Sequence, residues 1–220
     1  MGLTRAAGQR RRIGLLGGSF DPVHVGHIAL ARAAQSALLL DEVHFIPAGI
    51  AWQKGGAVAS SGDRVAMLQL ALGSESSWII DHCELQRPGA SYTIDTLLEL
   101  RAALGPEPAL VLLLGADQFR NLPSWQRFGE LLEHCHLAVT QRAPRQLSEL
   151  PEVLEALLAA RGSDALPDAP AGSIVFFNMP PVPVSSSGIR AQLAAGQQPA
   201  ELLPPGVLDY IESKHLYLRS

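Results

Sequence analysis

The sequence predicts an α/β fold: a Rossmann-like, doubly wound parallel sheet with helices on both faces. Short apolar runs alternate with longer segments that carry apolar residues at helical spacing. The short runs are almost continuously apolar, which is typical of strands that are buried on both faces of a parallel sheet. With 220 residues, 47% of them hydrophobic, the chain can bury such a core, and we expect one domain over 1–220.

Strands and helices are expected to alternate along most of the chain. The expected strands are 13–16, 43–47, 79–80, 110–114, 137–140 and 174–177. The expected helices between them are 27–39, 63–72, 94–104 and 125–134. Two more helices are expected near the end, one after the serines of 185–187 and one after Pro204 and Pro205.

Two segments fall outside this pattern. Residues 1–11 contain basic residues with no apolar run of the length a signal peptide needs, so we expect a flexible extension. Residues 141–172 contain four prolines around a helical patch at 153–161, and we expect a surface insertion without a chemical role.

Composition limits the partners that the chain can have. No apolar run approaches the roughly 20 residues that span a bilayer, so no membrane partner is expected. The formal charge of −4 argues against a broad nucleic-acid surface. Cys83 and Cys135 stand far apart without a Cys-x-x-Cys motif, which indicates a reducing, cytoplasmic location. A phosphate ligand would therefore need a local cluster of donors.

The stretch GGSFDPVHVGH, residues 17–27, is the candidate cluster. Gly17 and Gly18 remove side chains where a ligand could approach the backbone, and they also permit positive φ angles. A helix beginning near Val25 would direct unpaired N–H groups at the same space. His24 and His27 are three residues apart, so both imidazoles can point there. The alternative is an ordinary strand-to-helix turn with two polar residues beside it.

As a whole, this stretch resembles the Gly-Gly-x-Phe-Asp-Pro-x-His-x-Gly-His signature of the nucleotidylyltransferase superfamily. The resemblance implies that the two histidines bind the triphosphate of a nucleoside triphosphate. The ATP-binding residues that it implies in this stretch are Gly17, Gly18, Ser19, Phe20, His24 and His27. The signature indicates adenylyl or cytidylyl transfer and leaves the acceptor open.

Four later motifs narrow the acceptor. They are FIPAGIAWQK (45–54), SYTIDTL (91–97), LLGADQFRNLPSW (113–125) and VSSSGIR (184–190). Together with the first motif they resemble bacterial nicotinate-nucleotide adenylyltransferase over 12–217. The resemblance implies transfer of an adenylyl group from ATP to nicotinate mononucleotide, with Mg²⁺ on the phosphates. The products would be nicotinate adenine dinucleotide, a precursor of NAD, and pyrophosphate.

Residues 45–54 place Lys54 in a glycine-containing loop, where its ammonium could reach phosphate oxygens. A lysine in such a loop is otherwise an ordinary solubilising residue. The Pro-Pro-His-Lys that is usual in the family is replaced here by Ala-Trp-Gln-Lys, so no role is assigned to Gln53. By resemblance, Lys54 binds the nicotinate nucleotide and acts in catalysis.

Two motifs are expected to hold the nicotinate ring. Ser91 or Thr93 is a candidate helix cap, and the backbone amides there would favour a carboxylate over an uncharged carboxamide. In the family this segment binds the nicotinate carboxylate, which implies roles for Tyr92 and Thr93. Trp125, expected at a helix start, offers a flat ring and a cation–π contact to the pyridine. The alternatives are simple capping for Thr93 and packing for Trp125.

The remaining nucleotide-binding residues lie in two strand-to-helix or loop-to-helix junctions. Gly115 and Asp117 follow the fourth strand, at the edge where open α/β sheets bind ligands, and Asp117 is expected to contact a hydroxyl or a metal-bound water. In VSSSGIR, the guanidinium of Arg190 can bind phosphate oxygens, and Ser187 replaces the threonine that is usual in the family. By resemblance, the ATP-binding residues of this motif are Ser185, Ser186, Ile189 and Arg190. The alternative is a capped surface helix.

Catalysis is expected to depend on positioning and on charge neutralisation, because the attacking group is a phosphate of the substrate. The residues expected to act are His24, His27, Lys54 and Arg190. No protein metal site is expected, since Mg²⁺ would be held mainly by the substrate phosphates. The cluster His134, Cys135 and His136 suggests a metal, but neighbouring strand residues point to opposite faces, so packing is favoured for it and for His82 and Cys83.

Two competing functions stay open. In the first, the chemistry is the same and the acceptor differs: nicotinamide mononucleotide, phosphopantetheine or the phosphate of a lipid head group. Thr93 and Trp125 argue against the last two, which have no aromatic carboxylate. In the second, the chain is a non-catalytic nucleotide-binding module, against which the complete set of histidines and Arg190 argues. The expected partners are ATP and nicotinate mononucleotide, and the sequence does not indicate the oligomeric state.

Overall fold

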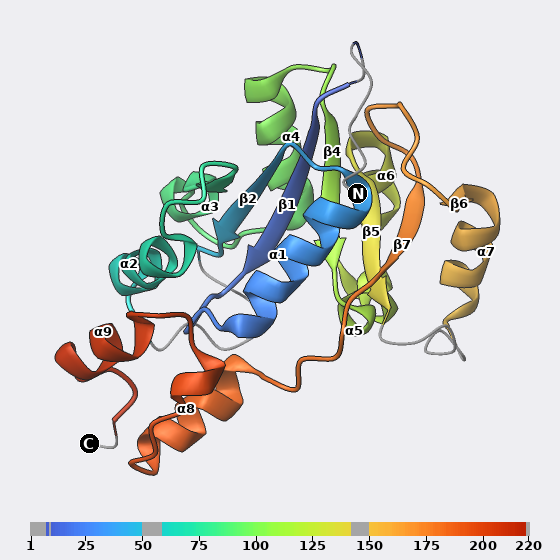
Figure 1. Cartoon of the computed structure of the whole chain (residues 1–220). Coiled ribbons are helices and arrows are strands. Elements are labelled where there is room, and N and C mark those ends of the chain that lie inside the picture. The colour runs from blue at the N-terminus through green and yellow to red at the C-terminus, as the bar shows by residue number, and fades with distance from the viewer. Residues whose placement is uncertain (1–7, 9, 50–58, 142–149, 219–220) are drawn as a thin grey trace. The chain divides into compact units, whose positions relative to one another are not determined.

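The computed structural model describes residues 8, 10–49, 59–141 and 150–218. Its strands form one sheet in the order β3-β2-β1-β4-β5-β7-β6 (Figure 1). The strands are β1 (Arg12–Gly18), β2 (Glu42–Pro47), β3 (Trp78–Ile80), β4 (Ala109–Leu114), β5 (His136–Gln141), β6 (Gly162–Ser163) and β7 (Ile174–Asn178). Every strand expected from the sequence is present, and β6 is additional.

The strand pairings are parallel where β1 meets β4, β4 meets β5, and β7 meets β5 and β6. The register places Ile13 opposite Leu110 and Leu137 opposite Ile174. All four of these side chains are fully buried, as continuous apolar strands require. The predicted α/β class with a Rossmann-like parallel sheet is confirmed.

Helices connect the strands. The α-helices among the described residues are α1 (Val25–Leu38), α2 (Ser61–Leu72), α3 (Cys83–Gln86), α4 (Thr93–Leu104), α5 (Ala116–Arg120), α6 (Leu131–His134), α7 (Glu152–Arg161), α8 (Ser186–Ala194) and α9 (Val207–Ser213). The 3-10 turns are η2 (Leu122–Ser124), η3 (Phe128–Glu130) and η4 (Ala200–Leu202). In the part of the chain that the structure describes, no helix combines the length and the apolar character needed to cross a membrane.

The chain folds into two compact units, each assembled from separate segments. The first unit comprises residues 1–16, 31–44 and 92–180, and the second comprises 17–30, 45–91 and 181–220. β1, α1 and β2 contribute residues to both units, because the division falls within each of them.

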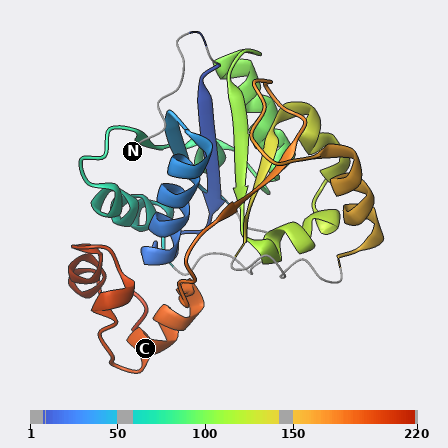
Figure 2. The ribbon, with the colours of Figure 1, turned by 45° about the vertical axis from the view of Figure 1, so that its right-hand side comes forward.

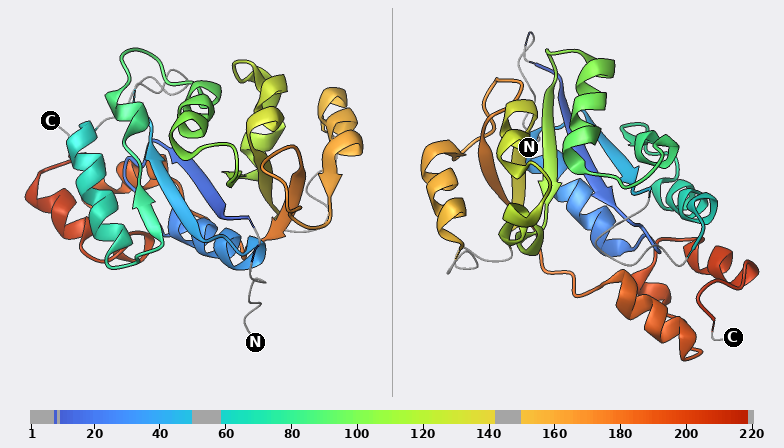
Figure 3. Two further views of the ribbon diagram at one scale, coloured as in Figure 1. Left: turned by 90° about the horizontal axis from the view of Figure 1, so that it is seen from above. Right: turned by 180° about the vertical axis from the view of Figure 1, so that it is seen from behind.

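The first unit contains most of the sheet. Its strands are covered on one face by α1 (Figure 1) and on the other by α4 and α6, which lie in front of the strands in the right panel of Figure 3. Buried Ala31 and Ala34 lie on the part of α1 that belongs to this unit, and their small side chains allow close packing. Helices therefore cover both faces of the sheet here, as the sequence predicts.

Two arginines tie the loops of the first unit together. Arg101 on α4 donates from Nε to the carbonyl of His134 (2.8 Å), and its two terminal nitrogens donate to the carbonyls of Pro108 and Pro170 (2.7 Å each). Arg10 donates to the Glu107 backbone and side chain. The role of 1–11 as a flexible extension stays a prediction, and Arg10 is one of the few described residues in that segment.

The segment 141–172 contributes a helix to the edge of the first unit. The helical patch expected at 153–161 is part of α7, which packs beside β6 and lies next to α6 in Figure 2. β6 extends the sheet through parallel pairing with β7. Residues 142–149 lie outside the described residues, and the surface role of the insertion stays a prediction.

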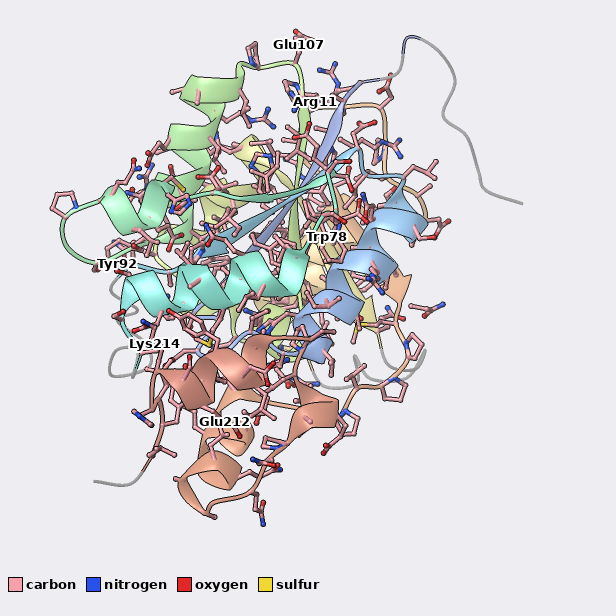
Figure 4. The ribbon with its side chains drawn as sticks, turned by 60° about the vertical axis from the view of Figure 1, so that its left-hand side comes forward. Arg11, Trp78, Tyr92, Glu107, Glu212 and Lys214 are labelled. Atoms are coloured by element: carbon pink, nitrogen blue, oxygen red, sulfur yellow. The ribbon has the colours of Figure 1, made fainter. Side chains whose placement is uncertain are left out.

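The second unit has its own core, in which the rings of Phe20, Phe45 and Trp78 pack in series with centroids 5.9 and 5.4 Å apart. α2 contacts α9. Tyr210 on α9 donates its hydroxyl to Asp63 of α2 (2.9 Å), and the end of α9 is marked in Figure 4 by Glu212 and Lys214. Both C-terminal helices expected from the sequence are present as α8 and α9.

The continuous helix expected over 125–134 is wrong. The segment instead forms η3 and the single turn α6, and Trp125 lies in extended backbone (φ −79°, ψ 145°) directly after η2. Arg127 adopts a left-handed conformation (φ 53°), which a continuous right-handed helix cannot contain.

Candidate active site

The site in the second unit begins where β1 ends, at Gly17 and Gly18. Neither glycine adopts the positive φ angle that it permits, and Phe20 has one instead (φ 48°). A Cβ at Gly17 would meet no described atom within 4 Å, whereas one at Gly18 would lie 3.2 Å from the Phe20 ring. Gly17 therefore leaves open space beside the backbone, and Gly18 makes room for Phe20.

Phe20 stabilises the turn although its backbone conformation is unfavourable for a residue with a side chain. Its ring is fully buried and packs edge-on against the imidazole of His27 (centroids 4.9 Å apart) and against Phe45. The turn continues through a cis peptide bond between Asp21 and Pro22 into the first turn of α1. Hydrophobic burial of Phe20 thus fixes the backbone that precedes the two histidines.

The two histidines lie together at the start of α1. Their imidazoles stack with centroids 3.7 Å apart and an interplanar angle of 24°. The backbone N–H of His24 donates to Nδ1 of His27 (3.2 Å), so His27 accepts at Nδ1 and carries its proton on Nε2. His27 therefore presents its Nε2–H as the donor in this arrangement.

The start of α8 packs against the same turn. Ser185 is the N-cap of α8 and accepts from the N–H of Gly188 (3.1 Å), and Ser186 donates its hydroxyl to the carbonyl of Pro22 (2.9 Å). A Cβ at Gly26 would lie 2.8 Å from Val184, so only glycine lets α1 approach the segment before α8 this closely. The N-termini of two helices consequently meet beside the histidines, and both favour an anion.

Arg190 anchors α8 to the turn. Its Nη1 donates to the carbonyl of Asp21 (2.7 Å) and lies 3.9 Å from the Asp21 carboxylate, while 30% of its side chain stays exposed. Ile189, next to it, is fully buried and belongs to the core. Ile189 could therefore contribute to a nucleotide site through its backbone, and Arg190 presents the charge.

Sequence reasoning missed three residues that build this site: Asp21, Arg64 and Tyr217. The buried Asp21 carboxylate accepts from the Tyr217 hydroxyl (2.7 Å) and from the N–H of Ala59 (3.1 Å). Arg64 of α2 is also buried and donates from Nη1 to the carbonyl of Ser19 (2.8 Å). Burial lowers the pKa of Arg64, and Asp21 counteracts this. Two guanidinium groups and one carboxylate leave a net positive charge at the turn.

Two of these residues had a signal in the sequence, because Asp21 is the aspartate of the signature in residues 17–27 and Arg64 stands out on its helix face. Arg64, Met67 and Leu68 share one face of α2, and all three are buried. A charged residue at a helical spacing that otherwise holds apolar side chains indicates a buried, paired charge. Tyr217 had no such signal, because it contacts a residue 196 positions earlier in the chain.

The first unit holds the residues expected to bind nicotinate. α4 begins at Thr93, and its N-cap residue is Tyr92, which makes no side-chain cap hydrogen bond. The expectation that Ser91 or Thr93 caps the helix is therefore wrong, although the carbonyl of Tyr92 accepts from the N–H groups of Asp95 and Thr96 (3.1 and 3.2 Å). Ser91, in the second unit, has a buried hydroxyl without a hydrogen-bond partner among the described residues.

Gly115, Asp117 and Trp125 follow β4 in consecutive turns of the first unit. Gly115 is the N-cap of α5, and its N–H donates to the side chain of Gln118 (3.0 Å). Asp117 is exposed in the first turn of α5, and its carbonyl accepts from Asn121 just before η2. Trp125 is half-buried at the end of η2, where its N–H donates to the carbonyl of Leu122. α5 contacts η2, so these residues lie on neighbouring turns.

Lys54 and Gln53 lie outside the described residues. The histidine and cysteine residues that resembled a metal cluster have other contacts: Cys135 donates to the carbonyl of Leu131 (3.3 Å), and His136 bonds to Ala169 (2.8 Å) and Ser173 (3.2 Å). Within the described ranges, no three His, Cys, Asp or Glu side chains are arranged to hold a metal ion.

Comparison with known proteins places these features in a family. The cytidylyltransferase-like family model matches residues 15–192. A Pseudomonas fluorescens protein named "Probable nicotinate-nucleotide adenylyltransferase" is 44% identical over 209 residues, which are 94% of this chain and 97% of that protein. A protein of the same name from Herminiimonas arsenicoxydans is 42% identical over 212 residues, with 94% and 97% coverage.

Solved structures share the fold. The Plasmodium falciparum nicotinic acid mononucleotide adenylyltransferase complexed with NaAD superposes with a TM-score of 0.73 at 19% identity, covering 94% of this chain and 98% of that one. The same enzyme complexed with APC gives a TM-score of 0.70. These structures show the fold, and the matches in sequence show that the chain belongs to the cytidylyltransferase-like family and, within it, to the nicotinate-nucleotide adenylyltransferases.

Proposed function

We propose that the protein transfers the adenylyl group of ATP to nicotinate mononucleotide, giving nicotinate adenine dinucleotide and pyrophosphate for NAD synthesis. The observation that carries the proposal is the convergence, in the second unit, of stacked His24 and His27 with the start of α8 and Arg190. Membership of the adenylyltransferase family supports the same reaction. It also makes a non-catalytic binding module the weaker alternative.

ATP is proposed to bind at this convergence. The open space beside Gly17 admits phosphate close to the backbone, and the N-terminal amides of α1 and α8 supply dipoles that favour an anion. His27 donates from Nε2, and the exposed part of Arg190 supplies a permanent positive charge. These groups neutralise charge as the α-phosphate is attacked and pyrophosphate departs.

The reaction needs no protein nucleophile, because the phosphate of nicotinate mononucleotide attacks directly. The protein accelerates such an in-line displacement by orienting the reactants and by placing fixed donors where negative charge accumulates. We propose that Mg²⁺ is held mainly by the phosphates of ATP, where it would neutralise charge on the leaving pyrophosphate. The donor set around the histidines is suited to phosphate oxygens and not to a cation, which is consistent with metal that arrives with the nucleotide.

The nicotinate end is proposed to bind residues of the first unit. No described side chain caps α4, and we propose that the carboxylate of nicotinate accepts from backbone N–H groups at this helix start. Thr93 and Tyr92 lie at that helix start, and the half-buried ring of Trp125 is available for stacking. Lys54 completes the proposed nicotinate-binding set, whereas Gly115 and Asp117 are proposed to bind ATP.

Two further proposals concern the protein as a whole. We propose a single functional domain over 1–220, because the cytidylyltransferase-like family model matches residues 15–192, which include segments of both units. A cytoplasmic location is proposed because both cysteines are free thiols.

The test is a pyrophosphate-release assay with ATP and Mg²⁺, in which nicotinate mononucleotide, nicotinamide mononucleotide and phosphopantetheine are offered separately. We expect clear preference for nicotinate mononucleotide. Equal turnover of nicotinamide mononucleotide would contradict the proposed recognition of the carboxylate. Preferred turnover of phosphopantetheine would identify it as the acceptor in place of nicotinate mononucleotide. No turnover of any acceptor would favour a non-catalytic binding module.

A further inference from the structure

The Tyr217 hydroxyl reaches the turn that precedes the histidines from the far end of the chain. Its hydrogen bond to Asp21 Oδ1 is 2.7 Å long and buried. We propose that Tyr217 is a positioning residue for adenylyl transfer: it holds the Asp21 carboxylate so that Arg190 stays directed at the nucleotide phosphates. This inference rests on the proposed function.

Asp21 connects Tyr217 to Arg190. Its Oδ1 accepts from Tyr217 and from the N–H of Ala59, while its Oδ2 lies 3.9 Å from Nη1 of Arg190. The carbonyl of the same residue accepts from Arg190 Nη1 at 2.7 Å. The guanidinium is therefore held by the backbone of Asp21, and the carboxylate next to it remains at a distance longer than a direct hydrogen bond.

Loss of the Tyr217 hydroxyl would remove one of the hydrogen-bond donors to the buried Asp21 carboxylate. Asp21 is 2% exposed, so water replaces the lost donor poorly. Arg190 lies 3.9 Å from this carboxylate with 30% of its side chain exposed, and a charged donor gives strong compensation for a lost hydrogen bond. We therefore expect the guanidinium to turn toward the carboxylate and away from the phosphates when Tyr217 cannot donate.

The backbone around Tyr217 is in an unfavourable conformation. His215 and Tyr217 both adopt left-handed backbone conformations (φ 53° and 63°), which cost free energy in residues that have side chains. Tyr217 is nevertheless buried. Burial, and then the hydrogen bond to Asp21, raises the pKa of Tyr217, so the phenol keeps its proton and donates.

The chain offers a matched control in Tyr210. Its hydroxyl also comes from the C-terminal segment and also donates to a carboxylate, that of Asp63, at 2.9 Å. The pKa of Tyr210 is also raised, by desolvation and by its carboxylate partner, although Tyr210 is half-buried and Tyr217 is buried. Asp63 lies on α2, and Tyr210 has no place in the proposed phosphate site. Tyr217→Phe and Tyr210→Phe therefore remove the same chemical group from two different carboxylates.

The experiment compares steady-state kinetics and thermal unfolding of the full chain with those of both variants. We expect Y217F to lower kcat about tenfold and to leave the KM for nicotinate mononucleotide within about twofold, because Arg190 acts on the ATP phosphates. We expect Y210F to keep both constants within about twofold. Both variants should lower Tm by a few degrees, roughly 2–8 °C, since each loses a hydrogen bond to a charged group.

Equal kinetic effects in the two variants, or no effect in either, would overturn the proposal. Tyr217→4-aminophenylalanine keeps a weaker donor in the same volume and should recover part of the lost kcat; failure to recover any would also contradict the inference. If Y217F does not fold, 4-aminophenylalanine at 210 and at 217 gives the same comparison, with kcat lowered only at 217.

The outcome is separable from that of the proposed function. If the parent protein turns over none of the three acceptors, the proposed function fails, and the parent and the two variants are compared by calorimetric titration with Mg·ATP. Weaker ATP binding in Y217F alone, by about tenfold, would still support the positioning role. Equal binding by all three proteins would overturn it.

Discussion

The tautomer of His27 gives the sharpest prediction about catalysis. His27 accepts the His24 N–H at Nδ1 (3.2 Å), so only Nε2 can donate to phosphate. Asparagine can reproduce the Nδ1 position of an imidazole, and glutamine the Nε2 position. We therefore expect His27→Asn to lower kcat strongly and His27→Gln to keep much of the activity.

The magnitude follows from the loss of one preorganised donor. Removing such a donor typically costs about 10²–10³ in kcat, or roughly 2.7–4 kcal/mol of transition-state stabilisation. We expect H27N to lose this amount and H27Q to stay within about tenfold of the parent, because an amide N–H still reaches the position of Nε2. Pyrophosphate release at saturating substrates measures kcat, and thermal unfolding establishes that both variants are folded. The tautomer assignment would be refuted by H27N retaining more activity than H27Q.

Three other predictions follow from the packing and from the buried titratable groups. Gly26→Ala should lower the free energy of unfolding by about 1–3 kcal/mol, because its methyl group would lie 2.8 Å from the Val184 side chain. Gly17→Ala should change the free energy of unfolding by less than about 0.5 kcal/mol and raise the KM for ATP. Urea unfolding measures both variants, and equal destabilisation would contradict the packing described for Gly26. Burial lowers the pKa of His136 below its ordinary 6.5, so the unfolded chain binds the proton more readily than the folded protein. The contribution of His136 to stability is therefore complete above pH 6.5. The free energy of unfolding decreases as the pH falls below 6.5, by up to about 1.4 kcal/mol per pH unit. His136→Gln should flatten this decrease, and an unchanged slope would show that other groups cause it. Burial raises the pKa of the Cys135 thiol to about 12, so iodoacetamide should leave it unmodified in the folded protein and modify it together with Cys83 in denaturant, as peptide mass spectrometry would show.

Much of the fold could be predicted because apolar periodicity is a local property. The run at 110–114 became β4 almost residue for residue, since a strand buried on both faces must be apolar throughout. The helix expected over 125–134 failed because apolar spacing does not report backbone dihedrals. The left-handed conformation of Arg127 interrupts a segment whose side chains would otherwise suit a helix.

The candidate site, like the fold, could be predicted only in part. The glycines and histidines of 17–27 are adjacent in the chain, so their proximity to one another could be predicted. The capping role expected of Ser91 or Thr93 was wrong, because a cap depends on the backbone geometry at the N-cap residue, which proved to be Tyr92. The Tyr217 contact with Asp21 depends on tertiary folding alone and could not be found by reading local patterns.

The central claim is tested most directly by a competition in one reaction. Equal concentrations of nicotinate mononucleotide and nicotinamide mononucleotide are supplied with limiting ATP and Mg²⁺, and the dinucleotide products are separated and identified by mass. We expect nicotinate adenine dinucleotide to be the dominant product, formed with one pyrophosphate per dinucleotide. An equal or larger yield of the amide dinucleotide, or no dinucleotide at all, would contradict the proposed function.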